Sequence, residues 1–411
     1  MRAETVLIEA SPGEVRGALM RDGAVWDVVH HRTSTPSRIG AEYRGRVRRI
    51  EPGINGAFVD IDIGADAFLR ARDAAPADGK GKRRARIAEI VHEGEGIDVR
   101  VVADAFADKG PRVVRIESEG GTSDGPGERK PPEGPVGQLL ERFASDRLVR
   151  IISNDAGVEK AVYTWLDANM SAAELSIERG RGSLFTERGI EDAIEAALAR
   201  RIVIPGGAEL VFDQAEALCV IDVNSGADSG KAGRAARDVN MKAVGEIARQ
   251  IRLRNIAGAI VIDALKMGAR DDRSKVLDRI RGAVRDDPGG VHVLGVTNLG
   301  LIEMTRTRTG PTLAERLLAA PAEPTLSPET VACDALRAAI RTAARTPAGG
   351  YRLLVSGPVA DCLEGPMSGA LDEAVRRTGR LDIVREPGRD MARFEVVLGS
   401  TQRSSSTVNA T

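Results

Sequence analysis

Cysteine, histidine and aromatic residues are all scarce in this chain of 411 residues, which has 3 cysteines, 4 histidines and 3% Phe, Trp and Tyr. Cys219, Cys333 and Cys362 lie far apart and are odd in number, which excludes a framework of paired disulfides and a CxxC zinc pair. The few histidines leave little material for a zinc hydrolase or a histidine-based triad. We therefore expect a reducing compartment, and each aromatic residue calls for an explanation of its position.

Net charge and long apolar runs are also missing. The 59 basic residues nearly balance the 60 acidic ones, so no global field attracts nucleic acid or a membrane, and any nucleic-acid site must be a local patch. The N-terminal segment carries charges within its first apolar stretch, and no window approaches 18 uncharged apolar residues. Both features argue against a signal peptide and a membrane span, and they predict a cytoplasmic protein.

Turn signals and composition divide the chain into several units. Residues 5–10 and 14–20 predict a hairpin around a Pro-Gly turn. Between residues 42 and 118, short β-type runs broken by Gly and Pro predict a small antiparallel barrel. Residues 117–135 hold Gly, Pro, Ser and charge, which is typical of a flexible linker. From residue 190 onwards, strands alternate with helices, so the expected fold class is α/β, in an α+β multidomain chain.

Two short apolar runs each end on an aspartate. The run in ALCVIDVNSG ends on Asp222, and AIVID ends on Asp263. Such runs are typical of buried strands, and neighbouring strand ends would bring both carboxylates to one point. Together with Asn224 they form a set of hard oxygen ligands that suits Mg²⁺, completed by substrate phosphate and water. Taken alone, each aspartate fits better as the cap of a strand end, with Asn224 and Ser225 in an Asx turn.

Phe58 and Phe68 are candidate nucleic-acid contacts. They lie on two predicted strands of the barrel that a short turn joins, and the flanking YRGRVRR run and Lys109 add positive charge. A place in the hydrophobic core is the usual fate of Phe. In oligonucleotide-binding barrels, however, such positions stack against bases. The scarcity of aromatic residues favours the nucleic-acid role and leaves the core role open.

Long stretches of the chain resemble the RNase E/G family, bacterial endoribonucleases of RNA processing and decay. VLIEASPGEVRGALMRDG and YRGRVRRIEPGINGAFVDIDIGADAFL look like the N-terminal hairpin and the S1 domain of that family. SLFTERGIEDAIEAALARRIVIPGGAELVFDQAEALCVIDVNSG, GEIARQIRLRNIAGAIVID and LGLIEMTRTRTGPTL look like its DNase I-like catalytic core. The segment from SPETVACDALRAAIR to RFEVVL resembles its small C-terminal domain.

The resemblance implies a domain order. We expect, in this order, the N-terminal hairpin of a reduced RNase H-like subdomain (1–36), an S1-like OB barrel (37–117), a flexible linker (118–136), the remainder of the RNase H-like subdomain (137–185), a DNase I-like catalytic core (186–318), a linker without zinc cysteines (319–327), a small C-terminal domain (328–400) and a disordered tail (401–411).

The resemblance also implies an activity. The metal-binding aspartates of the family fall on Asp222 and Asp263, and its active-site asparagine falls on Asn224. These residues would hold Mg²⁺, which Mn²⁺ can replace, and would cut single-stranded RNA to leave 5′-phosphate and 3′-hydroxyl ends. The RNA-contacting positions of the family fall on Phe58, Phe68, Lys109, Arg306 and Arg308. For the two arginines of the TRTR segment, salt bridges to Glu303 are an equally good interpretation.

Departures from the family pattern lead to further expectations. The connector AAPAEPTLS lacks the paired cysteines that share a zinc ion between two subunits in the family, so we expect no structural zinc and either a monomer or a homodimer. The VRTAA-type segment of the family's 5′-monophosphate sensor is missing. Lys266 stands where the family commonly has an acid, and Asn298 stands where it has an arginine.

These changes near the metal keep a second interpretation open, namely a catalytically weak or inactive RNA-binding protein of the same family. Retention of both aspartates and of Asn224 favours the endoribonuclease. A third possibility, an assembly protein for other decay factors, has little support because the chain lacks a long disordered tail for recruiting them.

Overall fold

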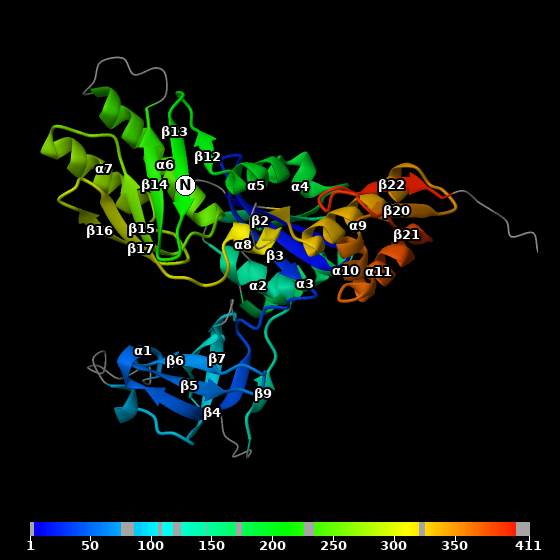
Figure 1. Cartoon of the computed structure of the whole chain (residues 1–411), viewed down its shortest axis with the longest axis horizontal. Coiled ribbons are helices and arrows are strands. Elements are labelled where there is room, and N and C mark those ends of the chain that lie inside the picture. Colours follow the sequence, from blue (N-terminus) through cyan, green and yellow to red (C-terminus); the bar gives the residue numbers. More distant parts are fainter. Residues whose placement is uncertain are drawn as a thin grey trace, which may run out of the picture.

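The computed structural model describes residues 4–74, 86–105, 109–117, 125–145, 147–169, 175–225, 234–319 and 325–399. The protein is a mixed α/β chain with a closed five-strand barrel and several further sheets. Figure 1 shows three α/β units side by side, with the barrel below them as a separate body. In the parts of the chain that the structure describes, no helix is long and apolar enough to cross a membrane. The predicted tail 401–411 lies outside the described residues.

The central unit is a five-stranded sheet with helices on both faces. Its strands are β1 (Glu4–Ser11), β2 (Glu14–Arg21), β3 (Ala24–Arg32), β10 (Leu148–Ser153) and β11 (Ser176–Arg179), in the order β11-β10-β1-β2-β3. Alternation along β1 sends Val6 and Ile8 toward α2 (Pro135–Phe143) and α3 (Ala156–Asn169), and Leu7 toward α4 (Leu184–Glu187) and α5 (Ile190–Leu198). The predicted hairpin is present, and β3 extends it by a strand that the sequence interpretation missed.

The barrel is inserted between β3 and α2. It consists of β4 (Glu42–Glu51), β5 (Gly56–Asp60), β6 (Ala67–Arg70), β7 (Gly96–Ala103) and β8 (Arg112–Arg115), and it closes because β4 pairs with both β5 and β7. The short elements η1 (Pro52–Ile54), α1 (Ala71–Ala74) and η3 (Ile87–Glu89) connect these strands. Val47, Val59, Leu69 and Val99 point inward and fill the barrel. β9 (Gly127–Lys130) adds to the edge of β4, so part of the predicted linker 118–136 is a strand.

The third unit is a six-stranded sheet that carries the predicted acidic residues. Its strands are β12 (Arg201–Val203), β13 (Glu209–Gln214), β14 (Leu218–Asn224), β15 (Gly258–Asp263), β17 (Ile302–Arg306) and β16 (Val291–Val296), in that spatial order. Helices α6 (Arg234–Leu253) and α7 (Arg270–Ala283) cover one face of this sheet. The core between them consists of β-branched and other aliphatic side chains, as the apolar strand runs predicted.

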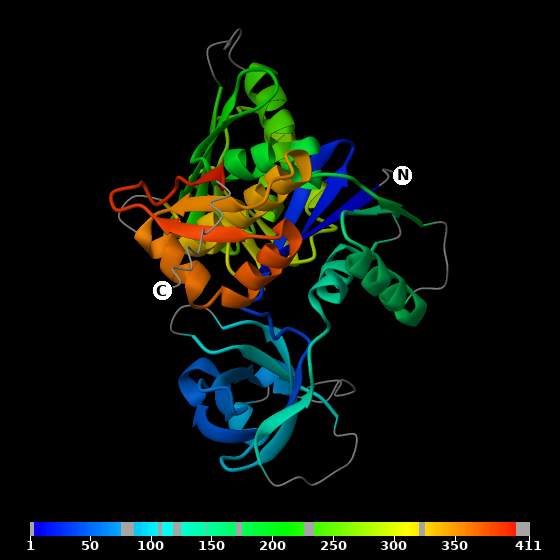
Figure 2. The same cartoon turned by 90° about the vertical axis from the view of Figure 1, so that its right-hand side faces the viewer.

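The C-terminal unit follows α8 (Leu313–Leu317) and a two-stranded ladder of β18 (Leu318–Ala319) and β19 (Thr325–Leu326). It contains α9 (Pro328–Arg345), β20 (Tyr351–Val355), α10 (Gly357–Glu364), α11 (Ser368–Thr378), β21 (Leu381–Arg385) and β22 (Glu395–Leu398). A buried ion pair and a buried hydrogen bond tie it to the central sheet, since Arg337 of α9 donates to Glu14 at 2.6 Å and Arg32 donates to the Thr330 hydroxyl at 2.8 Å. The view in Figure 2 shows the barrel again separate from these three units.

Candidate active site and nucleic-acid interface

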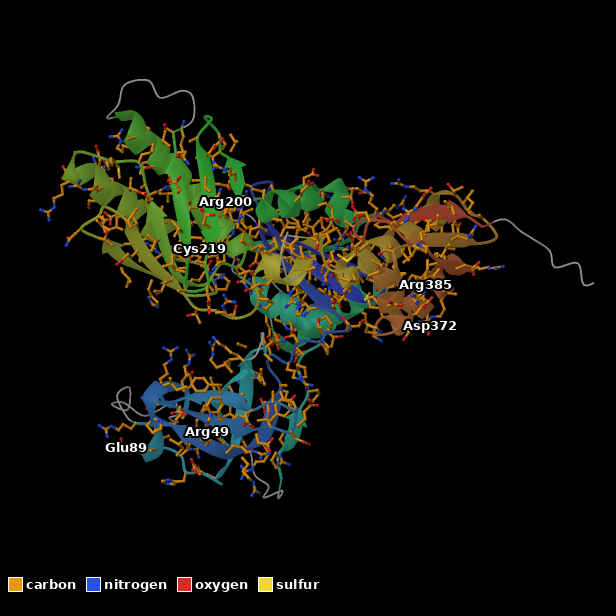
Figure 3. All side chains as sticks on the ribbon, in the orientation of Figure 1. Arg49, Glu89, Arg200, Cys219, Asp372 and Arg385 are labelled. Atoms are coloured by element: carbon orange, nitrogen blue, oxygen red, sulfur yellow. The ribbon has the colours of Figure 1, made fainter. Side chains whose placement is uncertain are left out.

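Asp222 and Asp263 are direct neighbours in the six-stranded sheet. Strands β14 and β15 run parallel, and their register pairs Asp222 with Asp263 at the carboxyl ends of both strands. Adjacent strands lie about 4.8 Å apart, and paired residues of a parallel ladder project from the same face. The two aspartates that the sequence singled out, 41 positions apart in the numbering, therefore stand side by side. Cys219, labelled in Figure 3, marks the strand that carries the first of them.

The acid pair stands on the face of the sheet that α6 and α7 do not cover. On β14, Cys219, Ile221 and Val223 are buried and point toward the helices. Strand alternation places Asp222 on the opposite face, where it is half-buried, while Asp263 is exposed. Both carboxylates are consequently accessible from solvent, as an ion or substrate would require.

Asn224 shares this face with Asp222, because it follows two residues later on the same strand. Its side-chain amide Nδ2 donates to Oδ2 of Asp222 at 2.8 Å. The bond orients the carboxylate and leaves the amide oxygen of Asn224 as an acceptor. The three residues predicted for catalysis thus lie together. Strand register brings Asp263 beside Asp222, and a hydrogen bond joins Asn224 to Asp222.

The donor set fits a magnesium ion better than a zinc or calcium ion. The two carboxylates and the amide offer oxygen atoms only, and Mg²⁺ is typically bound through one or two carboxylates while water and substrate phosphate complete its octahedron. Within the described ranges, no group of three or more His, Cys, Asp or Glu side chains is placed to hold a metal. An all-protein cage of the kind that zinc or calcium prefers is therefore not found in that part of the chain.

The sheet edge beside the acid pair is formed by several loops. Because β17 runs antiparallel to both β15 and β16, the carboxyl end of β16 lies at the same edge as those of β14 and β15. The loop after β16 carries Asn298, which lines a pocket together with Arg270, Arg273 and Ser274 of α7. Lys266, in the loop after β15, is exposed. Two arginines near Asn298 were not singled out from the sequence, since nothing in it relates α7 to this loop.

Phe58 and Phe68 form a pair on the outer surface of the barrel. They lie directly opposite each other on β5 and β6, with ring centroids 5.5 Å apart and ring planes tilted by 51°. Both rings are half-buried and neither belongs to the barrel core. Gly56 makes room for this arrangement, because a Cβ atom there would lie 2.4 Å from the Phe68 ring. Both rings therefore lie at the barrel surface with part of each ring accessible.

Arginines flank the aromatic pair on both sides. Arg49 of β4 lies opposite Phe58, with its guanidinium carbon 4.8 Å from the ring centroid, and Arg112 of β8 lies beside Phe68. Lys109, just before β8, is exposed. The result is a row of cation, aromatic, aromatic and cation across four neighbouring strands. The sequence interpretation included Arg49 only as one member of the basic YRGRVRR run and missed Arg112, because the barrel register, with a bulge around Arg48, decides which side chains share a face.

Arg112, at one end of this row, contacts the unit that carries the acid pair. Nη1 of Arg112 donates to the backbone oxygen of Arg308 at 3.4 Å, in the loop that follows β17. Side-chain atoms of Arg308 also approach the carboxylate of Glu315 at 3.3 Å. Arg308 is therefore placed between the barrel and the six-stranded sheet, at the edge of the sheet opposite to the acid pair.

Arg306, the other arginine of the TRTR segment, lies in the protein interior. Its side chain is fully buried, and Nε donates to Oδ1 of Asp287 at 2.8 Å. Nη1 donates to Asn255 and to the backbone oxygen of Ile256. Its charge partner is thus Asp287, and not Glu303 as the sequence interpretation considered. This position argues against a contact with RNA, because a buried guanidinium is not accessible to a phosphate.

The cysteines are placed as packing residues. Cys219 and Cys333 are fully buried, and burial raises the pKa of the Cys219 thiol to about 11. Burial likewise raises the pKa of the Cys333 thiol. Thiols held in the protonated form by apolar surroundings are poor metal ligands and poor nucleophiles. Neither residue is available for chemistry at the acid pair.

Comparisons with known proteins find a similarity over the part of the chain that carries the acid pair. Residues 131–309 match the Ribonuclease E/G family, and this range contains Asp222, Asn224 and Asp263. Ribonuclease G of Escherichia coli strain K12 is 28% identical over 97% of this chain and 100% of its own length. The alignment runs over 491 positions, more than the 411 residues here, so that relative has segments that this chain lacks.

Two further relatives extend the likeness. Ribonuclease G of Haemophilus influenzae is 28% identical over 76% of this chain and 81% of its own length. Ribonuclease E of Escherichia coli strain K12 is 26% identical over 74% of this chain, but this covers only 36% of the relative. The match therefore covers a larger share of the two ribonuclease G proteins than of ribonuclease E.

Proposed function

Because this chain is a divergent homologue of the ribonuclease E/G family, we propose that it is a Mg²⁺-dependent endoribonuclease that cleaves single-stranded RNA in RNA processing or decay. The observation that carries the proposal is the direct register of Asp222 and Asp263 at the ends of two parallel strands. Two carboxylates in direct register on an accessible face supply the oxygen ligands that a divalent cation needs, whereas the cap of a strand end does not require a second acid beside it.

The residues of the site have separate tasks. Asp222 and Asp263 would hold the ion, and the amide of Asn224 keeps the Asp222 carboxylate in place through its 2.8 Å hydrogen bond. When bound, Mg²⁺ supplies a lowered pKa for its water and charge stabilisation for the scissile phosphate. Attack by water on the phosphorus with departure of the 3′ oxygen would leave 5′-phosphate and 3′-hydroxyl ends.

The barrel would supply the affinity for RNA. Bases of an unpaired strand would stack on Phe58 and Phe68, and Arg49, Arg112 and Lys109 would contact the phosphates beside them. Stacking is independent of base identity, so the surface favours single strands without reading their sequence. The contact between Arg112 and the Arg308 loop joins the barrel to the six-stranded unit, at the edge of the sheet opposite to the acid pair.

Cleavage of a labelled, unstructured RNA with and without Mg²⁺ tests the proposal. Asp222→Asn and Asp263→Asn should each abolish cleavage while RNA affinity and melting temperature stay near those of the unchanged protein, because each removes a ligand charge and no packed side chain. Asp213→Asn is the matched control, since Asp213 lies on the neighbouring strand β13, is exposed and pairs with Arg200 at 2.5 Å. Full cleavage by the double aspartate variant, or in excess EDTA, would contradict the metal mechanism.

A second candidate, an RNA-binding protein with little or no activity, has one observation in its favour. Lys266 lies three residues after Asp263 and is exposed, so a positive charge stands near the acid pair and competes with an ion there. Lys266→Asp should then raise activity or Mg²⁺ affinity. Strong Mg²⁺-dependent cleavage by the unchanged protein would decide for the enzyme.

Location and assembly complete the proposal. We propose a cytoplasmic protein that acts as a monomer or a homodimer without structural zinc, because the described residues of the 319–327 connector contain no cysteine and the chain has only the three buried or half-buried ones. Light scattering of the purified protein gives the oligomeric state.

A further inference from the structure

Asp263 is the last residue of its strand and has a ladder partner on one side only. It pairs with Asp222 on β14, whereas the pairing of β15 with β17 ends one residue earlier, at Ile262 and Ile302. The backbone that follows, residues 264–269, leaves the sheet and leads to α7. The orientation of Asp263 therefore depends on how this segment is held.

Asn240 of α6 holds the segment by both groups of its side-chain amide. Nδ2 donates to the backbone oxygen of Leu265 at 2.9 Å, and the backbone N–H of Leu265 donates to Oδ1 of Asn240 at 3.1 Å. Asn240 is only 1% exposed. Its amide thus acts as a peptide group would in a neighbouring strand, and it extends the hydrogen bonding two residues beyond Asp263.

The surroundings make this attachment rigid. Ala264, Leu265 and Met267 are half-buried against the core under α6 and α7, and Asn240 itself is buried, so the bonds to Leu265 are partly shielded from water. A second bond fixes the far end of the segment, where Nη1 of Arg273 donates to the backbone oxygen of Met267 at 3.0 Å. The segment after Asp263 is consequently tied to both helices that cover the sheet.

We propose that Asn240 is a positioning residue for the acid pair, which fixes the backbone after Asp263 so that its carboxylate stays directed toward the ion shared with Asp222. This inference rests on the proposed function and deepens it. Asn240 itself lies on the helix side of the sheet and touches neither ion nor RNA. Residues that orient metal ligands typically change metal affinity or activity by about 10–100-fold when they are replaced.

A purely structural role of Asn240 would change stability alone, so the test measures metal affinity directly. Binding of Mn²⁺ without RNA, followed by electron paramagnetic resonance or calorimetry, is compared for the unchanged protein, Asn240→Ala and Gln250→Ala. Gln250 is the matched control because it is a side-chain amide on the same helix, is also 1% exposed and bonds Glu246 and Arg254, away from the acid pair.

We expect Asn240→Ala to bind Mn²⁺ about 10–100-fold more weakly, with a cleavage rate that excess Mg²⁺ restores and with unchanged RNA affinity. Gln250→Ala should melt at a lower temperature and bind Mn²⁺ normally. Equal Mn²⁺ affinity in Asn240→Ala and the unchanged protein, or an equal loss in both variants, would overturn the proposal.

The test still decides if Asn240→Ala does not fold or if the unchanged protein does not cleave RNA. Should Asn240→Ala not fold, Asn240→Gln, which keeps both amide groups but displaces them by a methylene group, takes its place, and an unchanged Mn²⁺ affinity there contradicts the proposal. If the unchanged protein does not cleave RNA, the proposed function fails, while the Mn²⁺ comparison still decides the role of Asn240.

Discussion

Phe58 and Phe68 face each other across two neighbouring strands of the barrel, and Arg49 lies over the ring of Phe58 on the side away from Phe68. Both rings stand outside the hydrophobic core, although an aromatic residue of a small barrel usually contributes to it. This relationship supports the proposal that unpaired bases stack on the barrel surface.

Phe58→Ala and Phe68→Ala should each weaken binding of single-stranded RNA by roughly 1–3 kcal/mol, because each removes a surface on which a base stacks. The melting temperature should change little. Phe143→Ala, which removes a buried ring from the central unit, should do the opposite, with a loss of about 3–5 kcal/mol in stability. Fluorescence anisotropy and thermal melting on the same samples separate the two effects, and normal RNA affinity of the Phe58→Ala variant would refute stacking.

Arg306→Ala should destabilise the fold by roughly 3–5 kcal/mol, because it leaves the carboxylate of Asp287 buried without its partner. RNA affinity of the folded protein should stay unchanged. Arg308→Ala should weaken RNA binding and leave the stability of the fold nearly unchanged, since a half-exposed ion pair with Glu315 contributes about 0–1 kcal/mol. Urea titration and RNA binding provide the two measurements. A stable Arg306→Ala variant with weak RNA binding would contradict the assignment of Arg306 to the interior.

Acid should destabilise the protein partly through His31. Burial, and then the nearby charge of Arg316, lower the pKa of this imidazole from 6.5 to about 4 in the folded state. The unfolded chain takes up the proton first as the pH falls, so stability is retained above pH 6.5 and is lost between pH 6.5 and about 4. His31→Gln should flatten this part of the stability profile, measured by urea unfolding at several pH values. His292→Gln, a change on the exposed side of β16, is the control that should leave the profile as it is.

Purified protein should contain no stoichiometric zinc, because four borderline or soft ligands are needed for a structural site and the cysteines lie far apart in the sequence. Elemental analysis checks this expectation, and one zinc ion for every one or two chains would contradict it.

RNA with a 5′-monophosphate should be cut at nearly the same rate as RNA with a 5′-hydroxyl. The resemblance places the VRTAA-type segment of the family in the RNase H-like region, and there this chain passes almost directly from the linker 117–135 into SDRLVRIISND. Paired rates on two RNAs that differ only at this end provide the measurement. A ratio above about tenfold, which corresponds to 1.4 kcal/mol, would mean that another anion pocket rewards the terminal phosphate.

The amino-acid sequence alone predicted the local features that depend on neighbours in the chain. An apolar run that ends on Asp222 or Asp263 predicts a strand with a carboxylate at its end, because a short run rich in β-branched residues favours an extended backbone. The alternation of strands and helices likewise predicted the α/β layer. The hairpin of β1 and β2 followed from the Pro-Gly turn between its strands.

Tertiary structure decided everything that depends on register and burial. Only the parallel pairing of β14 with β15 places Asp222 beside Asp263, and only packing under α6 brings Asn240 to the backbone of Leu265. Barrel closure with a bulge in β4 selected Arg49 as the neighbour of Phe58. Arg306 and Arg308, two residues apart, became an interior ion pair and a residue between two units, because β17 ends at Arg306 and the loop that follows carries Arg308 out of the sheet. No sequence pattern states which environment each arginine will meet.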